Sequence, residues 1–191
     1  MKTKSITKLT VIAAVCALSA VTQMRAQQTD RGSGRENRGT ENRGQLSAKD
    51  YHFVREAAQG GMEEVQMGQL AQQKGSSQAV KDFGQRMVTD HNKANDELKQ
   101  LVSQKGATLP ATLTRRENST LEDLQKLSGK DFDKKYAAQM VKDHKADVKD
   151  FQDAAKDLTD ADLKAFAQKT LPTLEEHLRL AEDMEKNVKS E

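Results

Sequence analysis

The sequence predicts an all-α protein: a ferritin-like four-helix bundle with a long crossover that contains a short extra helix. Three observations indicate this fold. The chain has 31% charged residues, only 4% aromatic residues and no Trp, which disfavours β-sandwiches and barrels. From Ser47 onward, apolar residues recur with the 3.6-residue period of a helix. The links between the four long periodic segments are short, long and short, which is typical of a ferritin-like bundle with one crossover.

Residues 1–26 have the form of a secretory signal peptide. Three lysines precede an uncharged apolar run over residues 9–21, and small residues follow it. The run is shorter than the roughly 20 residues that a membrane helix needs. We therefore expect export to the periplasm or cell envelope, with cleavage after Ala20 or Ala26 and no integral membrane span in the mature chain. An uncleaved anchor is the alternative.

The mature chain is expected to lack thiols and to be nearly neutral. The single cysteine, Cys16, lies in the leader, so no disulfide or thiolate site would remain. Of the 31 basic residues four lie in the leader, which leaves 27 against 29 acidic residues. Such a chain lacks the basic footprint of a nucleic-acid-binding protein, so we expect no nucleic acid partner. The sequence leaves other partners and the oligomeric state open, an oligomer included.

Residues 27–46 are expected to form a disordered linker. Before Leu46 the segment has no apolar side chain, so it cannot bury enough surface to offset the entropy lost on ordering. The sequence Glu-Asn-Arg-Gly occurs at 36–39 and again at 41–44. Arg-Gly repeats also occur in RNA-binding tails, but acids interleave with the arginines here, which favours a solvated linker.

The first long helix is expected over 48–74 and the second over 77–105. Ser47 is placed to cap the first helix, and Gly75 follows its end. Gly106 ends the second helix. Their apolar stripes are Phe53, Ala57, Gly60, Gly61, Met67, Gly68 and Ala71 in the first, and Val80, Phe83, Met87, Ala94, Leu98 and Leu101 in the second.

The middle link, 106–128, is expected to contain a short helix. Thr114 and Glu117 have the spacing of a capping box, and three leucines give this helix an apolar side. The link is long enough to run the length of the bundle.

The third long helix is expected over 129–157 and the fourth over 160–188. Thr159 and Asp162 are expected to open the fourth helix. Pro172 lies inside it and should kink it or break its hydrogen-bond ladder. Links of two or three residues force antiparallel hairpins, and each long helix spans roughly 40 Å.

Four polar residues occupy positions on the apolar stripes, one in each long helix of the 47–188 bundle domain. They are Glu64, His91, His144 and His177. Each lies near the middle of its helix, and mid-height is the same level whichever way a helix points. We therefore expect them to meet as one layer inside the bundle. Burying any of these groups in a charged form without a partner would cost on the order of several kcal/mol of folding free energy.

An acid precedes each of these histidines. Asp90, Asp143 and Glu176 lie about 100° around the helix from the imidazole that follows them, at the edge of the seam. They could orient an imidazole on an adjacent helix or act as outer groups of a metal site.

Two interpretations of the layer stay open. One carboxylate and three imidazoles suit Fe, Cu or Zn, and Met87 and Met140 could add soft ligands for Cu(I). The other interpretation is a buried polar layer that fixes register, with each histidine neutral and paired. Di-iron bundles carry Glu-x-x-His, but Val88, Val141 and Leu174 take the Glu position here. The di-iron motif is therefore absent.

Three glycines inside the first helix need a reason, because each costs about 1 kcal/mol there. Gly60, Gly61 and Gly68 indicate close approach of a neighbouring helix, and the alternative is room beside Glu64 for a small ligand.

The sequence favours a non-enzymatic protein over an enzyme. It contains no phosphate-binding glycine loop and no HExxH motif. The charge run over 142–150, which includes Asp147, mixes signs at helical spacing and is interpreted as a solvated face. His52, near the start of the first helix, is expected at the surface. A metal-dependent oxidase that uses the layer is the enzymatic alternative.

Several motifs in order carry a resemblance to a known family. The chain contains AAQGGMEEV at 57–65, MVTDH at 87–91 and TLPTLEEHL at 170–178. Over 48–185 it resembles the bacterial exported family called domain of unknown function 4142. The resemblance implies a ferritin-like bundle, usually behind a signal peptide and sometimes described as an outer-membrane or periplasmic protein, and it supplies no activity. The positions shared in the family correspond here to Glu64, Asp90, His91, His144 and His177.

Overall fold

The computed structural model describes residues 42–190. The predicted signal peptide and residues 27–41 of the predicted linker lie outside that part. The all-α prediction is confirmed, and within residues 42–190 there is no strand. The helices are α1 (Ala48–Lys74), α2 (Gln78–Gln104), α3 (Arg115–Gln125), α4 (Gly129–Asp157) and α5 (Ala161–Ser190). Each predicted helix is present, and the bounds of the long helices agree within two residues.

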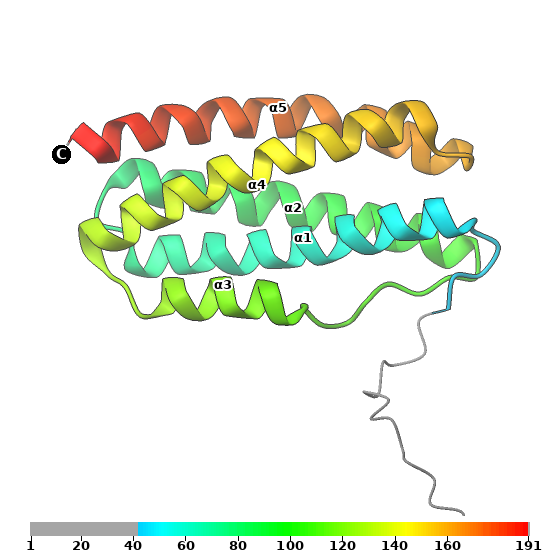
Figure 1. Ribbon diagram of the computed structural model, residues 1–191, viewed down its shortest axis with the longest axis horizontal. Coiled ribbons are helices and arrows are strands. Elements are labelled where there is room, and N and C mark those ends of the chain that lie inside the picture. The colour runs from blue at the N-terminus through cyan, green and yellow to red at the C-terminus, as the bar shows by residue number, and fades with distance from the viewer. Residues whose placement is uncertain (1–41, 191) are drawn as a thin grey trace, which may run out of the picture. The chain divides into compact units, whose positions relative to one another are not determined.

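Two helical hairpins form the bundle. Helices α1 and α2 make one hairpin and α4 and α5 make the other, while α1 also contacts α4 and α2 contacts α5 (Figure 1). The crossover between the hairpins runs along the bundle, and α3 within it packs against α1 and α4. The short, long, short connections are therefore those expected for a ferritin-like bundle.

The predicted caps of α1 and α3 are confirmed. The Asp50 N–H donates to the Ser47 hydroxyl oxygen at 3.1 Å. At α3 the Glu117 N–H donates to Thr114 Oγ1 at 3.3 Å, and the Thr114 N–H donates to Glu117 Oε2 at 2.6 Å. This reciprocal pair is a capping box, and it satisfies two backbone donors that the first turn leaves free.

The predicted cap of α5 is wrong. Asp160, not Thr159, accepts the free donors of the first turn, from the N–H groups of Asp162 and Leu163, both at 3.1 Å. Thr159 does not cap the helix, because its N–H donates to Asp50 Oδ1 in α1 at 2.9 Å. Asp50 is 109 positions away in the sequence, so this tertiary contact replaces the local cap.

The turn of each hairpin is held by a carboxylate from the other hairpin. Asp50, near the start of α1, binds Thr159 in the α4–α5 turn. Asp133, near the start of α4, accepts the N–H groups of Ser76 and Ser77 in the α1–α2 turn at 3.0 and 2.9 Å. Both carboxylates are 2% exposed, so these bonds are shielded from water. We call these two contacts the reciprocal caps.

The predicted disordered linker is too long at its C-terminal end. The Thr108 N–H donates to the Asn42 carbonyl at 2.8 Å, and the Gln45 N–H donates to the Lys105 carbonyl at 3.0 Å. Leu46 is buried among apolar residues of the bundle. Residues 42–46 are therefore ordered against the end of α2, since Leu46 supplies the apolar anchor that the preceding residues lack.

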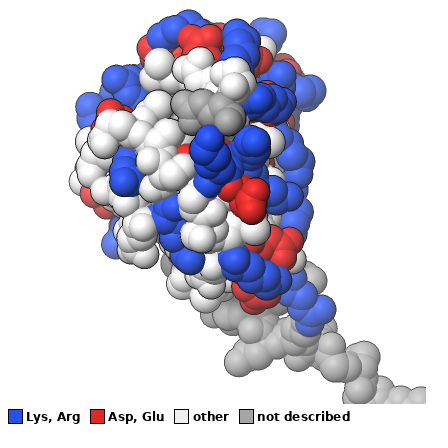
Figure 2. All heavy atoms as spheres, turned by 90° about the vertical axis from the view of Figure 1, so that its left-hand side faces the viewer, with Lys and Arg blue, Asp and Glu red and all other residues white. Residues whose placement is uncertain are grey.

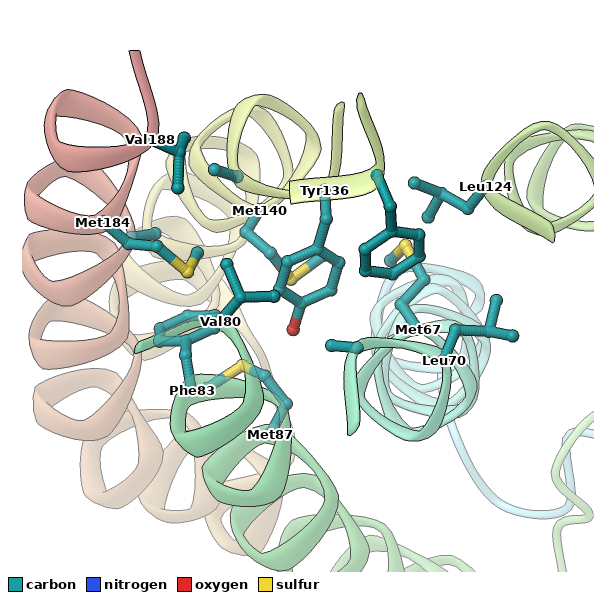
Figure 3. Close-up of a cluster of buried hydrophobic side chains, with 14 of the residues drawn as sticks. Met67, Leu70, Val80, Phe83, Met87, Leu124, Tyr136, Met140, Met184 and Val188 are labelled. Atoms are coloured by element: carbon teal, nitrogen blue, oxygen red, sulfur yellow. The ribbon is translucent and has the colours of Figure 1, made fainter. Parts of the chain in front are cut away.

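The hydrophobic core consists of two clusters, one toward each end of the bundle. Cluster A lies toward the α1–α2 turn, and Figure 3 shows its methionines, Phe83 and Tyr136 packed together. Cluster B lies toward the α4–α5 turn. The main members of cluster A are Met67, Val80, Phe83, Met87, Phe132, Tyr136, Met140, Ala181 and Met184. The main members of cluster B are Phe53, Val54, Leu98, Val102, Phe151, Leu163, Phe166 and Leu174.

Helix α5 continues through Pro172. The residue is exposed, and the segment is helical without interruption from Ala161 to Ser190. Pro172 therefore does not end the helix, although a proline has no N–H and cannot donate the hydrogen bond to the carbonyl four residues earlier. Within residues 42–190 no helix combines the length and the apolarity needed to cross a bilayer.

The surface carries basic and acidic side chains close together. Figure 2 shows this mixture at the end of the bundle where α5 finishes. Here Lys189 pairs with Glu185 at 2.7 Å and Lys186 with Asp183 at 3.3 Å. Charges of opposite sign therefore compensate one another locally, and such exposed pairs contribute little to stability.

Candidate metal centre

The structure brings Glu64, His91, His144 and His177 together between clusters A and B. The three imidazole centroids lie 5.3–5.8 Å from one another. All four side chains are buried, at 0–6% exposure. Each long helix contributes to cluster A on one side of its polar residue and to cluster B on the other side. His52, by contrast, is exposed as expected.

His144 is the most buried of the histidines, and its tautomer is fixed. Its Nδ1–H donates to the Met140 carbonyl at 3.0 Å, because a carbonyl can only accept. Nε2 therefore carries a lone pair when the ring is neutral. Burial, then the neighbouring His177, lower the pKa of His144 to about 3, so the ring is neutral at physiological pH.

Glu64 lies beside His91. The His91 Nδ1 atom is 3.0 Å from Glu64 Oε2, so the carboxyl group faces this edge of the ring. The other ring nitrogen, Nε2, is buried without a hydrogen-bond partner. Burial, followed by the adjacent His144 and His177, holds the pKa of His91 well below its usual value, so this ring too is neutral.

His177 is oriented by an acid from another helix. Its Nε2 lies 2.9 Å from Asp90 Oδ2 of α2, so Nε2–H donates and Nδ1 is left with a lone pair. Nδ1 is also buried and unpartnered. Burial lowers the pKa of His177, and the Asp90 hydrogen bond opposes that shift. This is the cross-helix geometry that the sequence suggested for Asp90.

Each of the three rings thus has one buried nitrogen without a hydrogen-bond partner. One ring nitrogen of each of His91, His144 and His177 lies within 4.8 Å of the others. In each ring the second nitrogen lies within 3.0 Å of a carboxylate or backbone carbonyl oxygen, which is the usual arrangement around metal-bound histidine. Nitrogens bound at roughly 2.0–2.1 Å to one tetrahedral zinc ion lie about 3.4 Å apart, so separations of up to 4.8 Å would have to shorten when an ion binds.

Asp147 belongs to this region, although its sequence context predicts a solvated face. It lies one turn after His144 in α4 and forms a second cluster with Glu64 and His144, again within 4.8 Å. The signal in the sequence was the spacing His144-x-x-Asp147, which puts both residues on one helical face. The mixed charges around Asp147 concealed it.

The carboxyl groups of Glu64 and Asp147 compete for one proton. Burial, followed by the nearby Asp147 and Asp143 charges, raises the pKa of Glu64 well above its usual value. Burial and then Asp143 raise the pKa of Asp147 to about 7. The two groups can hydrogen-bond only while one holds a proton, and with both ionised Glu64 Oε1 has no partner.

A small cavity of about 30 Å³ adjoins these carboxyl groups. This volume is enough for one water molecule or one ion. Residues of all four long helices line it, including Gly60, Gly61, Glu64, His91, Asn95, Asp147 and Thr170.

The glycines of α1 have different roles: one allows close approach of a neighbouring helix, and two lie beside the cavity. A methyl group on Gly68 would lie 2.6 Å from the Gly84 carbonyl oxygen, so this glycine permits close approach of α2. At Gly61 the space is taken by the Asn95 side chain, whereas nothing lies within 4 Å at Gly60. Gly60 and Gly61 both line the cavity beside Glu64.

The other two acids expected near the histidines lie apart from them. Glu176 pairs with Arg179 at the surface, at 2.8 Å. Asp143 accepts from Gln139 at 2.9 Å and faces the side covered by α3, where it joins Glu63. Burial and then Asp143 raise the pKa of Glu63 to about 7.

Tyr136 and the methionines flank the histidines on the cluster A side. The Tyr136 hydroxyl is buried without a partner, and burial followed by Glu64 raises its pKa well above the usual value. Phe83 packs edge-on against Tyr136, His144 and His177, with centroids 6.2–6.4 Å apart. Met87 and Met140 lie in cluster A with them (Figure 3).

Comparisons with known proteins support the fold and leave the chemistry open. A family model described as "Domain of unknown function (DUF4142)" matches residues 35–184. No curated protein matches. A DUF305 fragment from Deinococcus radiodurans has a TM-score of 0.66 at 10% identity, covering 74% of this chain and 98% of that chain. A DUF305 protein from Streptomyces coelicolor, named as secreted, has a TM-score of 0.62 at 15% identity, covering 73% and 93%.

Proposed function

The chain belongs to the DUF4142 family, and from that premise we propose that it is an exported, non-enzymatic metal-binding protein of the cell envelope. One transition-metal ion is held by His91, His144 and His177. Export is supported by the leader pattern of residues 1–26.

The observation that carries this proposal is the set of unpaired ring nitrogens. A polar layer that only fixed register should satisfy its own hydrogen bonds, because each unsatisfied buried group costs about 1–3 kcal/mol. Here His91 Nε2, His144 Nε2 and His177 Nδ1 are all buried and unpartnered. A metal ion would use all three lone pairs at once.

The donor set favours borderline metals. Three neutral imidazoles suit Zn, Cu or Fe, and the choice among these depends on geometry and supply rather than on affinity alone. The lowered histidine pKa values mean that no proton has to leave these rings before a metal binds. When bound, the metal would supply a Lewis-acid centre in a site closed by Phe83 and the apolar clusters.

The test is a Zn²⁺ titration of the metal-free mature chain by calorimetry, with melting curves alongside. We expect one ion per chain and stabilisation by about 2.7 kcal/mol at a free Zn²⁺ concentration 100 times Kd. Alanine at His91, His144 or His177 should weaken binding by more than the about 10- to 100-fold typical of outer groups. His52→Ala is the matched control and should bind as the parent does.

Circular dichroism separates loss of binding from loss of fold in these variants. If Zn²⁺, Cu²⁺ and Fe²⁺ all leave the melting temperature unchanged, the proposal is wrong and the structural polar layer is correct.

A further inference from the structure

The carboxyl groups of Glu64 and Asp147 form, with His144, a second cluster of possible cation ligands. Glu64 Oε1 lies 3.5 Å from His144 Nε2. Both atoms are acceptors, because His144 Nδ1–H is committed to the Met140 carbonyl. Two facing acceptors need a proton or a cation between them. Ligand atoms bound to one ion at about 2.1 Å are separated by roughly this distance.

Asp147 completes a mixed oxygen and nitrogen donor set. Its carboxyl group lies within 4.8 Å of the Glu64 and His144 donor atoms. Glu64 Oε1 and His144 Nε2 are both buried and without a hydrogen-bond partner, so this cluster is more than a group of surface acids. The cavity of about 30 Å³ lies directly against Glu64 and Asp147.

The two carboxyl groups also occupy matching places in the two hairpins. Asp50 and Asp133 make the reciprocal caps. Glu64 follows Asp50 by 14 positions and Asp147 follows Asp133 by 14 positions, which is close to four helical turns. Both therefore project at a similar height from their caps, into the space between α1 and α4.

We propose that the bundle interior offers a metal ion a second location, formed by Glu64, Asp147 and His144. This deepens the proposed function, on which it rests. Two carboxylate oxygens and one imidazole favour a harder divalent ion such as Mn²⁺, whereas three imidazoles favour Zn²⁺ or copper. His144 Nε2 is common to both locations and has one lone pair, so only one location is filled at a time. Occupancy is therefore exclusive, and the ion's hardness selects the location.

The test uses Mn²⁺ and Zn²⁺ on the mature chain, with Mn²⁺ followed by electron paramagnetic resonance. The parent should bind one Mn²⁺ and release it when one equivalent of Zn²⁺ is added. Asp147→Asn should weaken Mn²⁺ binding by at least about 100-fold and change Zn²⁺ binding by less than about threefold. His177→Ala should weaken Zn²⁺ binding and leave Mn²⁺ binding nearly unchanged. His144→Ala should weaken the binding of both ions.

The matched control is Asp153→Asn, which changes an exposed acid of the same helix that pairs with Lys149. It should leave both ions unaffected. Equal weakening of both ions by Asp147→Asn would show a single location and overturn the inference. Simultaneous binding of Mn²⁺ and Zn²⁺ would also overturn it, because His144 would then not be shared. Zn²⁺ binding without Mn²⁺ binding would overturn the inference and leave the proposed function standing. Binding of neither ion would overturn both.

Discussion

Each buried histidine of the centre has a neighbouring oxygen atom at its second ring nitrogen. Glu64 lies beside His91, the Met140 carbonyl orients His144, and Asp90 orients His177. These partners make the ligand nitrogens available without touching the metal themselves. Among the acids that precede a histidine, only Asp90 has this role in the described part of the chain.

Asp90→Ala should therefore weaken Zn²⁺ binding by about 10- to 100-fold, the usual cost of losing an outer hydrogen-bond partner of a metal ligand. The His177 ring would lose the bond that fixes its tautomer. Calorimetric titration measures the effect. Glu176→Ala is the matched control, because Glu176 also adjoins a histidine in sequence but pairs with Arg179 at the surface. An equal loss in both variants would contradict the assignment.

Asp147 makes the stability of the metal-free protein depend on pH. Its pKa is about 7 in the folded chain against a usual value of 3.8, so the folded state holds the proton more tightly than the unfolded state. The stability that goes with this proton is present below about pH 4 and is lost as the pH rises through 7. Asparagine cannot ionise and avoids this loss.

Asp147→Asn should thus gain unfolding free energy relative to the parent between pH 5 and pH 8, as measured by urea denaturation of metal-free samples. Asp153→Asn should show a constant difference over the same range, because its side chain is exposed and its partner Lys149 lowers the pKa of the carboxyl. A smaller advantage for Asp147→Asn at pH 8 than at pH 5 would refute the prediction.

Single residues are where sequence reasoning was weakest. Glu64 and the three histidines could be selected because each interrupts an apolar stripe. Asp147 could not be separated from its charged neighbours, since whether an acid at the stripe edge is buried depends on the facing helix. The role of Thr159 is not predictable from its neighbours in sequence for the same reason, because Asp50 binds it from another helix.

At the scale of helices, α1 and α2 are held close by glycine. A methyl group on Gly84 would lie 2.7 Å from Ala71 Cβ and 2.7 Å from the Gly68 carbonyl oxygen. Backbone therefore meets backbone at the Gly68–Gly84 crossing. The loss of helix propensity at Gly68, about 1 kcal/mol, is compensated by this packing.

Gly68→Ala should destabilise the protein, since the extra methyl group would meet the Gly84 backbone, and overpacking typically costs about 1–3 kcal/mol. Gly60→Ala is the contrasting variant, because nothing lies within 4 Å of a methyl group there. It should stabilise α1 by about 0.4–1 kcal/mol through the unfolded state. Urea denaturation of the two variants tests both, and stabilisation by Gly68→Ala would contradict the close-packing interpretation.

The helices themselves were largely predictable from local signals. Ser47, the capping box of Thr114 and Glu117, and the glycines at 75 and 106 mark boundaries within two residues of those observed. These signals act within one turn and need no tertiary contact. The effect of Pro172 could not be predicted in this way, because the surroundings of α5 decide whether a proline interrupts a helix.

At the scale of the bundle, connection lengths were sufficient to predict the topology. Two short links required two hairpins, and the long middle link allowed the crossover. The reciprocal caps and the division of the core into clusters A and B were not predictable, since both depend on which residues of separate helices face each other.

The reciprocal caps have a consequence for how the chain can be divided. Each hairpin lacks the carboxylate that completes its own turn, and each supplies only part of both apolar clusters. If the exposed bond between Ala111 and Thr112 were cut, peptides 42–111 and 112–190 should each remain largely unfolded alone. Mixed, they should reassemble as a 1:1 complex that recovers helicity and Zn²⁺ binding, as circular dichroism and size-exclusion chromatography would show.

A stable fold of either peptide alone would contradict this dependence. In the intact chain the loop around Ala111 joins the two halves and so raises the local concentration of one near the other. Because the entropy of closing a loop changes slowly with its length, residues inserted beside Ala111 should cost little stability. We therefore expect the chain to behave as two complementary peptides, each of which needs the other to fold.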